Sequence, residues 1–249
     1  MTFNFLIAPD FAPERFAGWH MLNTTLQRRS GLGLHLLTPA SAHEQSELLA
    51  GGTVDLVYAN PFDATDMIRT QGYVPFARPA KRFDEMVIAT GIESGISAVE
   101  DLKAGCHIAL TENKDVKLIG LRLLEPADLT EALIEWVPVD SYQAAARRAI
   151  KGEVEAAFFL ADAYASLSRM TRSQMQVLVE SAINDISHVV LAHPRIAENL
   201  PAISGALLGI GQSAGDADVL EALGLPSGFE AMTQEDAEFM IDLMDTLLD

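Results

Sequence analysis

Short apolar runs alternate along the chain with longer segments in which apolar residues recur every three or four positions. The first run covers Phe3–Ala8, and a similar run, Cys106–Leu110, follows about a hundred residues later. Short runs bounded by polar turns are typical of buried strands, and the three-to-four spacing is typical of amphipathic helices. The pattern predicts an α/β protein whose parallel strands are covered by helices.

The chain repeats part of itself at an offset of 100 residues. The stretch LLTPASAHEQSELLAGGTVDLVYANPFDA, residues 36–64, aligns without a gap on WVPVDSYQAAARRAIKGEVEAAFFLADAYA, residues 136–165. Ser41 matches Ser141 and Gly52 matches Gly152, so both copies predict a serine N-cap, a helix, a glycine stop and an apolar strand. Each half is therefore expected to be a βαβαβ unit.

Two similar halves predict two lobes. We expect residues 1–84 with 186–249 to form the first lobe and residues 85–185 the second, joined by a hinge of two crossings near 76–90 and 177–192. The last segment is expected to be mostly helical and to rejoin the first lobe. Its final helix, Gln234–Leu248, is expected to bury the stripe formed by Phe239, Leu243, Met244 and Leu247.

Parallel sheets bind ligands beyond the carboxyl ends of their strands. The candidate ligand loops follow Ala8, Leu37, Val57, Leu110, Val137 and Phe159. The loop after Val57 is the most distinctive, because Tyr58 and Asn60 are replaced in the second copy by Phe158 and Leu160. For Ser41 and Ser141, a purely structural N-cap worth about 1 kcal/mol and a ligand contact both stay open.

The chain resembles the type II periplasmic-binding-protein superfamily, and within it the substrate-binding proteins of phosphate, phosphite and phosphonate ABC transporters. The segments that carry the resemblance, in the family's order, are APDFAPERFAGW, ELLAGGTVDLVYANPFDA, SAVEDLKAGCHIAL, DSYQAAARRAIKGEVEAAFF and VESAIND. The resemblance implies two lobes that close about a hinge on a small molecule held in the cleft between them. It also implies a polar cleft position at Glu180.

Two loops depart from the family's phosphonate-binding pattern. The Ser/Thr-rich turn that cradles phosphoryl oxygens in the family is here Thr111-Glu112-Asn113-Lys114-Asp115. Its two acids place negative charge at a helix N-terminus, where an anion would otherwise be stabilised. The family's Ser-His-Asp at the later helix start is here Ser141-Tyr142-Gln143, so only the serine is carried over.

These arguments together give the expected ligand contacts: Asp10, Phe11, Ser41, Tyr58, Asn60, Pro61, Thr111, Asn113, Ser141, Tyr142 and Glu180. No catalytic residue, metal ligand or cofactor is expected. The six histidines have no metal-ligand spacing, and the chain has neither a phosphate-binding P-loop nor a nucleophile elbow.

Charge and composition narrow the partners. The net charge is −18, and the segment from Ile196 onward carries eleven acidic residues without a single Lys or Arg. Such a chain is expected to bind neither nucleic acid nor an anionic membrane, because it repels phosphates. No apolar run approaches the roughly 18 residues of a membrane span. The single Cys106 excludes an intrachain disulfide and is expected to be buried.

The sequence favours a cytoplasmic sensor or carrier of a small molecule, an anion among the options. The first residues do not read as a secretory signal, although a leader removed beforehand would make the protein periplasmic. Two alternatives stay open. One is an enzyme on the same scaffold, resembling cytosolic lyases of menaquinone biosynthesis. The other is an interaction protein without a ligand, its cleft filled by Phe158 and Phe159. A protein partner or a homodimer is also open.

Overall fold

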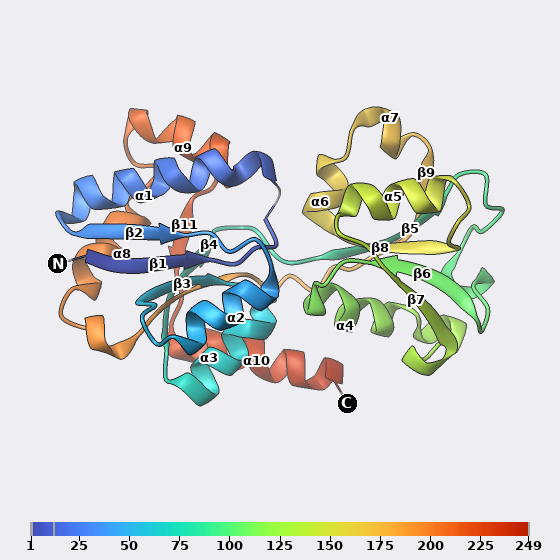
Figure 1. Ribbon diagram of the computed structural model, residues 1–249, viewed down its shortest axis with the longest axis horizontal. Coiled ribbons are helices and arrows are strands. Elements are labelled where there is room, and N and C mark those ends of the chain that lie inside the picture. Colours follow the sequence, from blue (N-terminus) through green and yellow to red (C-terminus); the bar gives the residue numbers. More distant parts are fainter. Residues whose placement is uncertain (1, 12, 249) are drawn as a thin grey trace. The chain divides into compact units, whose positions relative to one another are not determined.

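The computed structural model describes residues 2–11 and 13–248, and the chain divides into two compact units (Figure 1). Unit 1 comprises residues 1–83 and 185–244, and unit 2 comprises residues 84–184 with 245–249. Both units are α/β, as the alternating apolar pattern predicts. None of the described helices is long and apolar enough to cross a membrane.

Unit 1 is built on a six-stranded sheet of order β11-β4-β10-β3-β1-β2. Its strands are β1 (Thr2–Ile7), β2 (Gly33–Leu37), β3 (Leu56–Ala59), β4 (Val74–Pro79), β10 (Val189–Ala192) and β11 (Phe229–Ala231). β1 pairs in parallel with β2 and β3, whereas β10 pairs antiparallel with both β3 and β4. The expected parallel sheet is therefore mixed, because the chain returning from unit 2 enters it in the opposite direction.

Helices cover both faces of this sheet, as Figure 1 shows. They are α1 (Phe16–Ser30), α2 (Ala42–Ala50), α3 (Pro61–Gln71), α8 (Leu200–Leu208), α9 (Ala217–Leu223) and α10 (Gln234–Leu248), with short 3₁₀ helices η1 (Pro13–Arg15), η5 (Pro194–Ile196) and η6 (Ala214–Asp216). One core cluster joins α1, α8 and α9 to the sheet through residues such as Trp19, Leu22, Leu207 and Leu220. The tail was expected to be helical, and β11 is an addition to that picture.

The helix α10 corrects one expectation. Phe239, expected in the core, is 62% exposed. The buried side instead carries Ala237, Met240, Ile241 and Met244, which have the spacing i, i+3, i+4, i+7. Two overlapping apolar stripes existed on this helix, and the one with the complete spacing faces the unit. Of the expected stripe, Met244 is buried.

Unit 2 has a five-stranded sheet of order β7-β6-β8-β5-β9. Its strands are β5 (Met86–Gly91), β6 (Cys106–Leu110), β7 (Ile134–Pro138), β8 (Ala156–Leu160) and β9 (Met175–Glu180). Its helices are α4 (Lys114–Leu123), α5 (Tyr142–Ile150), α6 (Ala161–Ser166) and α7 (Arg169–Arg172), with 3₁₀ helices η2 (Val99–Asp101), η3 (Glu125–Ala127) and η4 (Glu131–Leu133). β6 pairs in parallel with β7 and β8, and β5 pairs antiparallel with β8 and β9.

Close packing fixes the helices of unit 2 on the sheet. The small residues Ala145, Ala146 and Ala149 of α5 lie in one core cluster with Phe159. On α4, a Cβ added to Gly120 would lie 2.2 Å from the ring of Phe158, so only glycine fits there. Phe158 and Phe159 are both fully buried and serve as core residues of the unit.

The repeat seen in the sequence is present in the backbone. Gly52 and Gly152 have nearly equal φ values of 66° and 68°, a left-handed conformation that favours glycine. Asp55 accepts from the Asn4 N–H at 2.8 Å, and Glu155 accepts from the His107 N–H at 2.6 Å. The matched acids therefore perform the same structural task, since each closes the hydrogen bonding beside the first parallel strand of its unit.

Candidate functional site

Four polar and aromatic side chains meet where strands of unit 1 end. Asp10 follows β1, Tyr58 and Asn60 belong to the end of β3, and His188 immediately precedes β10. Because β10 runs antiparallel to β3, with Val189 opposite Ala59, its first residues lie beside the last residues of β3. We call Asp10, Tyr58, Asn60 and His188 the Asp10 cluster.

An acid–histidine contact holds the cluster together. His188 Nε2 lies 3.2 Å from both carboxylate oxygens of Asp10. Both side chains are largely buried, with exposed fractions of 13% for Asp10 and 9% for His188. The contact joins residues 178 positions apart in the sequence.

Burial raises the pKa of Asp10, but the charge and hydrogen bond of His188 act in the opposite direction. Hydrogen bonds from the backbone of Asp10 and from the side chain of Asn60 also lower the pKa of Asp10, and its pKa ends below the ordinary value. Asp10 is therefore an ionised carboxylate at neutral pH. A buried negative charge at a strand end is a group to which a positively charged part of a ligand can bind.

Aromatic rings form the wall of the cluster. Tyr58 stacks on His188 with ring centroids 4.8 Å apart and planes 20° apart. The ring of Trp19 of α1 also lies against Tyr58, with centroids 4.6 Å apart, and the ring of Phe11 lies 6.1 Å from that of Trp19. The indole Nε1 of Trp19 is buried and makes no hydrogen bond to any residue that the structure describes. A buried donor without an acceptor is costly, by about 1–3 kcal/mol.

Asn60 and Pro61 start the helix that follows β3. Asn60 Oδ1 accepts from the Asp63 N–H at 2.8 Å, which makes Asn60 the N-cap of α3, and Pro61 is its buried first residue. Proline suits that position because the first helical N–H has no partner within the helix. Both residues thus have structural roles, and Asn60 combines its role with the hydrogen bond to Asp10.

The serines expected in ligand loops are N-caps in the structure. Ser41 accepts from the Glu44 N–H and Ser141 accepts from the Ala144 N–H, both at 3.2 Å. Equal geometry in the two copies is what capping requires. Their contribution to ligand binding stays a prediction.

The remaining candidates lie at the carboxyl edge of the unit 2 sheet. Asn113 caps α4 by accepting from the Val116 N–H at 3.0 Å, two residues after the half-buried Thr111. Tyr142 begins α5, with its ring 6.0 Å from that of Phe159. Glu180 is the exposed last residue of β9. Their roles in binding stay predictions too.

Acidic residues dominate this edge of unit 2. Glu112 and the buried Asp115 flank the start of α4, Asp140 precedes α5, and Asp162 lies in the first turn of α6. Glu85, one residue before β5, accepts from the Asn184 N–H at 2.8 Å and from the Ser181 hydroxyl. Glu85 therefore ties together the two segments through which the chain enters and leaves unit 2.

Several bases that could neutralise a ligand anion are engaged within their own unit. Arg78 donates to Glu230 at 2.7 Å, and Arg82 donates to the Gly224 carbonyl at 2.7 Å. Lys117 pairs with Glu131 and lies over the ring of Trp136, 4.9 Å from its centroid. These contacts direct Arg78, Arg82 and Lys117 toward structural roles.

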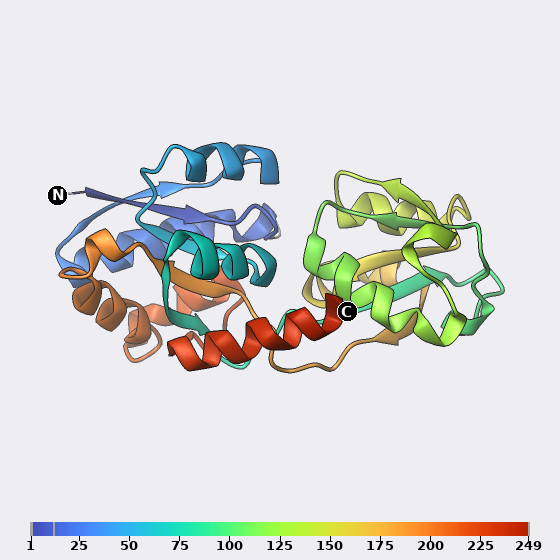
Figure 2. The same ribbon diagram turned by 90° about the horizontal axis from the view of Figure 1, so that it is seen from below.

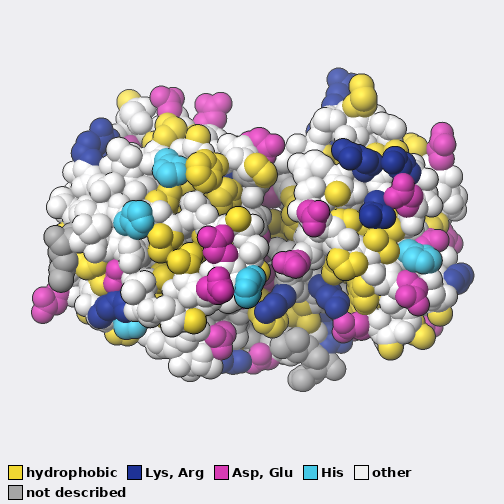
Figure 3. All heavy atoms as spheres, in the orientation of Figure 1, with side chains coloured by type: hydrophobic (Ala, Val, Ile, Leu, Met, Phe, Trp, Pro, Cys, Tyr) yellow, Lys and Arg dark blue, Asp and Glu magenta, His cyan; other side chains and the backbone are white. Residues whose placement is uncertain are grey.

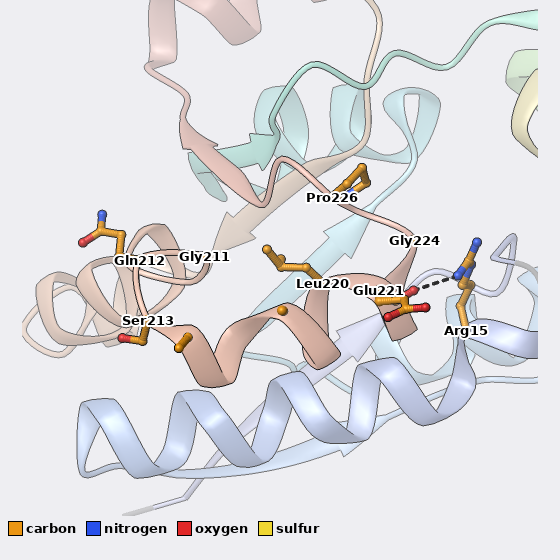
Figure 4. Close-up of a pocket in the computed structure, with 10 residues that line it drawn as sticks. Arg15, Gly211, Gln212, Ser213, Leu220, Glu221, Gly224 and Pro226 are labelled. Carbon is orange, nitrogen blue, oxygen red and sulfur yellow. Dashed lines mark hydrogen bonds between the residues drawn. The ribbon is translucent and has the colours of Figure 1, made fainter.

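A pocket of about 820 Å³ lies elsewhere on unit 1, beside α9 (Figure 4). Arg15 crosses one end of it and donates to the Glu221 carbonyl at 3.0 Å, while Leu220 and Gly224 contribute further lining. None of the candidate ligand residues lines this pocket. Arg15 serves to join η1 to α9, and the pocket is not the candidate site.

His188 is the residue of the cluster that sequence reasoning missed. It lies at the start of an apolar strand, five residues from His193, and that spacing was interpreted as excluding a metal pair. The available signal was its position between the buried Ile186 and a fully buried strand, because a histidine there lies at the end of a central strand. Among the described residues, no group of three or more His, Cys, Asp or Glu could hold a metal ion.

Comparison with known proteins agrees with the fold. A family model described as "ABC transporter, phosphonate, periplasmic substrate-binding protein" matches residues 5–237. No curated protein matches the chain.

Solved structures give the same picture. The chain is similar to PhnD1 of Prochlorococcus marinus in complex with methylphosphonate, with 10% identity, a TM-score of 0.83, and 99% of this chain and 98% of that chain covered. A binding protein component of a phosphonate ABC transporter from Pseudomonas aeruginosa gives 13% identity, a TM-score of 0.79, and coverage of 100% and 89%. The periplasmic aliphatic sulphonate binding protein SsuA of Escherichia coli gives 19% identity, a TM-score of 0.69, and coverage of 99% and 86%.

Proposed function

Because the chain belongs to the family of phosphonate ABC transporter substrate-binding proteins, we propose that it binds a small molecule at the Asp10 cluster and that this molecule carries an amine. The observation that carries the proposal is the ionised Asp10 carboxylate, held by His188 and Asn60 at the strand ends of unit 1. Strand ends of this kind are where α/β sheets bind ligands.

The charges at the strand ends support an amine rather than a doubly charged anion as the recognised group. Asp10 is negative, and the ring of Tyr58, which stacks on His188, adds an aromatic group to the same cluster. In unit 2, the N-terminus of α4 carries Asp115 and is capped by Asn113, which weakens its attraction for an anion. A phosphonate that also carries an amine would fit both the family and these charges.

Matched ligands test the proposal. Thermal unfolding is measured with 2-aminoethylphosphonate, methylphosphonate, ethanolamine and phosphate, each over a range of concentrations. At a hundred times its dissociation constant a ligand adds about 2.7 kcal/mol of stability. We expect the aminophosphonate to raise Tm and methylphosphonate, which lacks the aminomethyl group, to have a much smaller effect. A larger shift with methylphosphonate would overturn the amine assignment, and silence of the whole panel would count against ligand binding.

Variants of Asp10 and His188 test whether the ligand binds at the Asp10 cluster. Asp10→Asn removes the charge and is expected to weaken aminophosphonate binding by tenfold or more, since a lost charge-assisted hydrogen bond is worth about 1.5–3 kcal/mol. His188→Gln tests the residue that orients Asp10. Glu198→Gln, an exposed acid of the same unit, is the matched control and should bind as the parent does. Equal binding by the Asp10 variant and the control would remove Asp10 from the site.

The dependence of affinity on pH tests the part that the Asp10 charge has in binding. The pKa of the Asp10 carboxyl lies below its ordinary value, so the group stays charged until the pH falls below that value. An amine bound through this charge should lose affinity as the pH falls into the range in which Asp10 takes up a proton, and Asp10→Asn should remove that loss.

The biological role is proposed as sensing or carrying the ligand in the cytoplasm, and this part remains a prediction. Fractionation of cells that express the chain from its own gene would place the protein. Incubation with the bound ligand, followed by mass spectrometry, tests the alternative of an enzyme on the same scaffold. Recovery of the ligand unchanged supports a binding protein, and a product would favour the enzyme.

A further inference from the structure

Unit 2 carries a concentration of positive charge that is unusual in a chain of net charge −18. Its members lie in the last turn of α5, at the C-cap of that helix and in α7, and they are Arg147, Arg148, Lys151, Arg169 and Arg172. Figure 3 shows Lys and Arg side chains gathered over these helices. We call these five residues the basic face.

Packing orients the basic face toward solvent. The alanines of α5, Ala145, Ala146 and Ala149, are buried on the sheet, so Arg147, Arg148 and Lys151 lie on the opposite side of the helix. Leu167, just before α7, belongs to the same core cluster as these alanines. The α5 and α7 parts of the basic face therefore cover the same side of the sheet.

Few acids of unit 2 neutralise the basic face. Glu153 lies 3.4 Å from Arg148 and 3.6 Å from Lys151, between exposed side chains. Arg172 donates to the Leu167 carbonyl at 3.2 Å. Among the described residues, Arg147 and Arg169 make no ion pair.

The composition of the basic face is that of a protein interface. Four of its five bases are arginines, and Met170 between two of them is 75% exposed. Arginine and methionine are enriched at protein–protein interfaces, whereas lysine is depleted. Arginine is also the base whose planar fork binds carboxylates in two-point contacts.

The same chain carries a surface of opposite charge. On α10, Glu235, Glu238, Phe239 and Asp242 have the spacing i, i+3, i+4, i+7 and are all exposed. This acidic stripe faces away from the buried residues of α10, and the helix runs along the surface of unit 1 in Figure 2. Arg69, 3.7 Å from Asp242, is the base that pairs with the stripe, and both side chains of that pair are exposed.

From these two surfaces we infer that one copy of the chain docks the acidic stripe of α10 onto the basic face of a second copy. Carboxylates of the stripe pair with the arginines, and Phe239 packs against Met170. The two surfaces differ, so the contact is head-to-tail, and it extends into longer assemblies unless it closes into a ring. The inference is independent of the ligand-binding function.

The contact is expected to be weak and sensitive to salt. Each copy carries a large negative charge, so copies repel one another until the complementary surfaces are close. The range of such charges falls from about 10 Å at 0.1 M salt to about 3 Å at 1 M. Sedimentation velocity of the full chain should show average size rising with protein concentration at low salt and a monomer at high salt.

Complementation between two variants tests the contact. The first variant carries Arg147→Gln, Arg148→Gln and Arg169→Gln, and the second carries Glu235→Gln, Glu238→Gln and Asp242→Asn. Each alone lacks one of the two surfaces and should be a monomer at low salt. Their equimolar mixture should form one-to-one dimers and nothing larger, because only one productive contact remains.

A control variant removes the same amount of positive charge elsewhere. It combines Arg28→Gln, Lys81→Gln and Lys103→Gln, which change exposed bases outside the basic face, and it should associate as the parent does. Unfolding curves of all variants verify that they are folded. A parent chain that is monomeric at low salt, or a mixture that stays monomeric, would overturn the inference. So would binding of the basic face to anionic vesicles without any self-association.

Discussion

The end of β3 in unit 1 and the end of β8 in unit 2 occupy matched places in the repeat and have different neighbours. Tyr58 lies against Trp19 and His188, at a strand end that also holds Asp10 and Asn60. Its counterpart Phe158 is fully buried against Gly120 of α4 and the ring of Trp136, 5.7 Å away.

The helix starts after these strands differ in the same way. Asn60 caps α3, an 11-residue helix, whereas Leu160 offers no side-chain cap to α6, which has six residues. One copy of the motif thus carries polar groups at its strand end, and the other buries the same positions in its core. The polar copy is the one at which we propose that a ligand binds.

The largest effect is expected from a substitution of Phe158, the buried counterpart of Tyr58. Phe158→Ala should lower the free energy of unfolding by about 3–5 kcal/mol, because the cavity left against Gly120 cannot easily collapse. Urea unfolding measures it. Phe239→Ala, at a mostly exposed ring, should change stability by about 0.5 kcal/mol or less. Comparable losses in the two variants would contradict the burial assigned to Phe158.

The next effect concerns Asp10, whose pKa is lowered in the folded state. A lowered folded pKa gives stability that is present above the unfolded value of about 3.9 and is lost as the pH falls through the folded value. Asp10→Asn should therefore cost about 1.5–3 kcal/mol at neutral pH and much less at pH 3 or below. Urea unfolding at both pH values checks the sign. A loss that is the same at both would show that charge is not the cause.

A swap at the helix start should have an intermediate effect. Asn60→Leu gives unit 1 the residue of unit 2, and it removes both the cap of α3 and the hydrogen bond to Asp10. We expect a loss of about 1–2 kcal/mol by urea unfolding. The reverse change, Leu160→Asn, should not create a counterpart of the hydrogen bond between Asn60 and Asp10, and it should leave ligand affinity unchanged. A neutral Asn60→Leu would show that the cap is dispensable.

The smallest effect is expected at the N-cap serine that both copies share. Ser41→Ala and Ser141→Ala should each cost about 1 kcal/mol, because both remove the same N-cap hydrogen bond. Equal losses without any change in ligand affinity would assign both serines to capping. A drop in affinity with only one of them would show where the copies diverge.

Sequence reasoning reached the features that depend on local chemistry. Ser41, Ser141, Gly52 and Gly152 were recognisable because caps and left-handed turns select few residue types. The two-unit α/β fold followed from the same signals and from the resemblance, and the family match confirms it.

The features set by tertiary structure were out of reach. His188 meets Asp10 only because β10 enters antiparallel between β3 and β4, and no local pattern specifies that pairing. The prediction that Phe239 is buried was wrong for a similar reason. Two apolar stripes fit α10, and tertiary packing decides which of them faces the unit. The lowered pKa of Asp10 likewise depends on neighbours far away in the sequence.

The place of β10 in the sheet also orders events during synthesis. Unit 2 is almost one continuous segment, residues 84–184, and can fold as soon as it leaves the ribosome. The strands β3 and β4 were made earlier, but they have no pairing between them until β10 arrives. His188 arrives with that strand. The Asp10 cluster is therefore assembled only on a nearly finished chain, and a nascent product that lacks β10 also lacks the contact between His188 and Asp10.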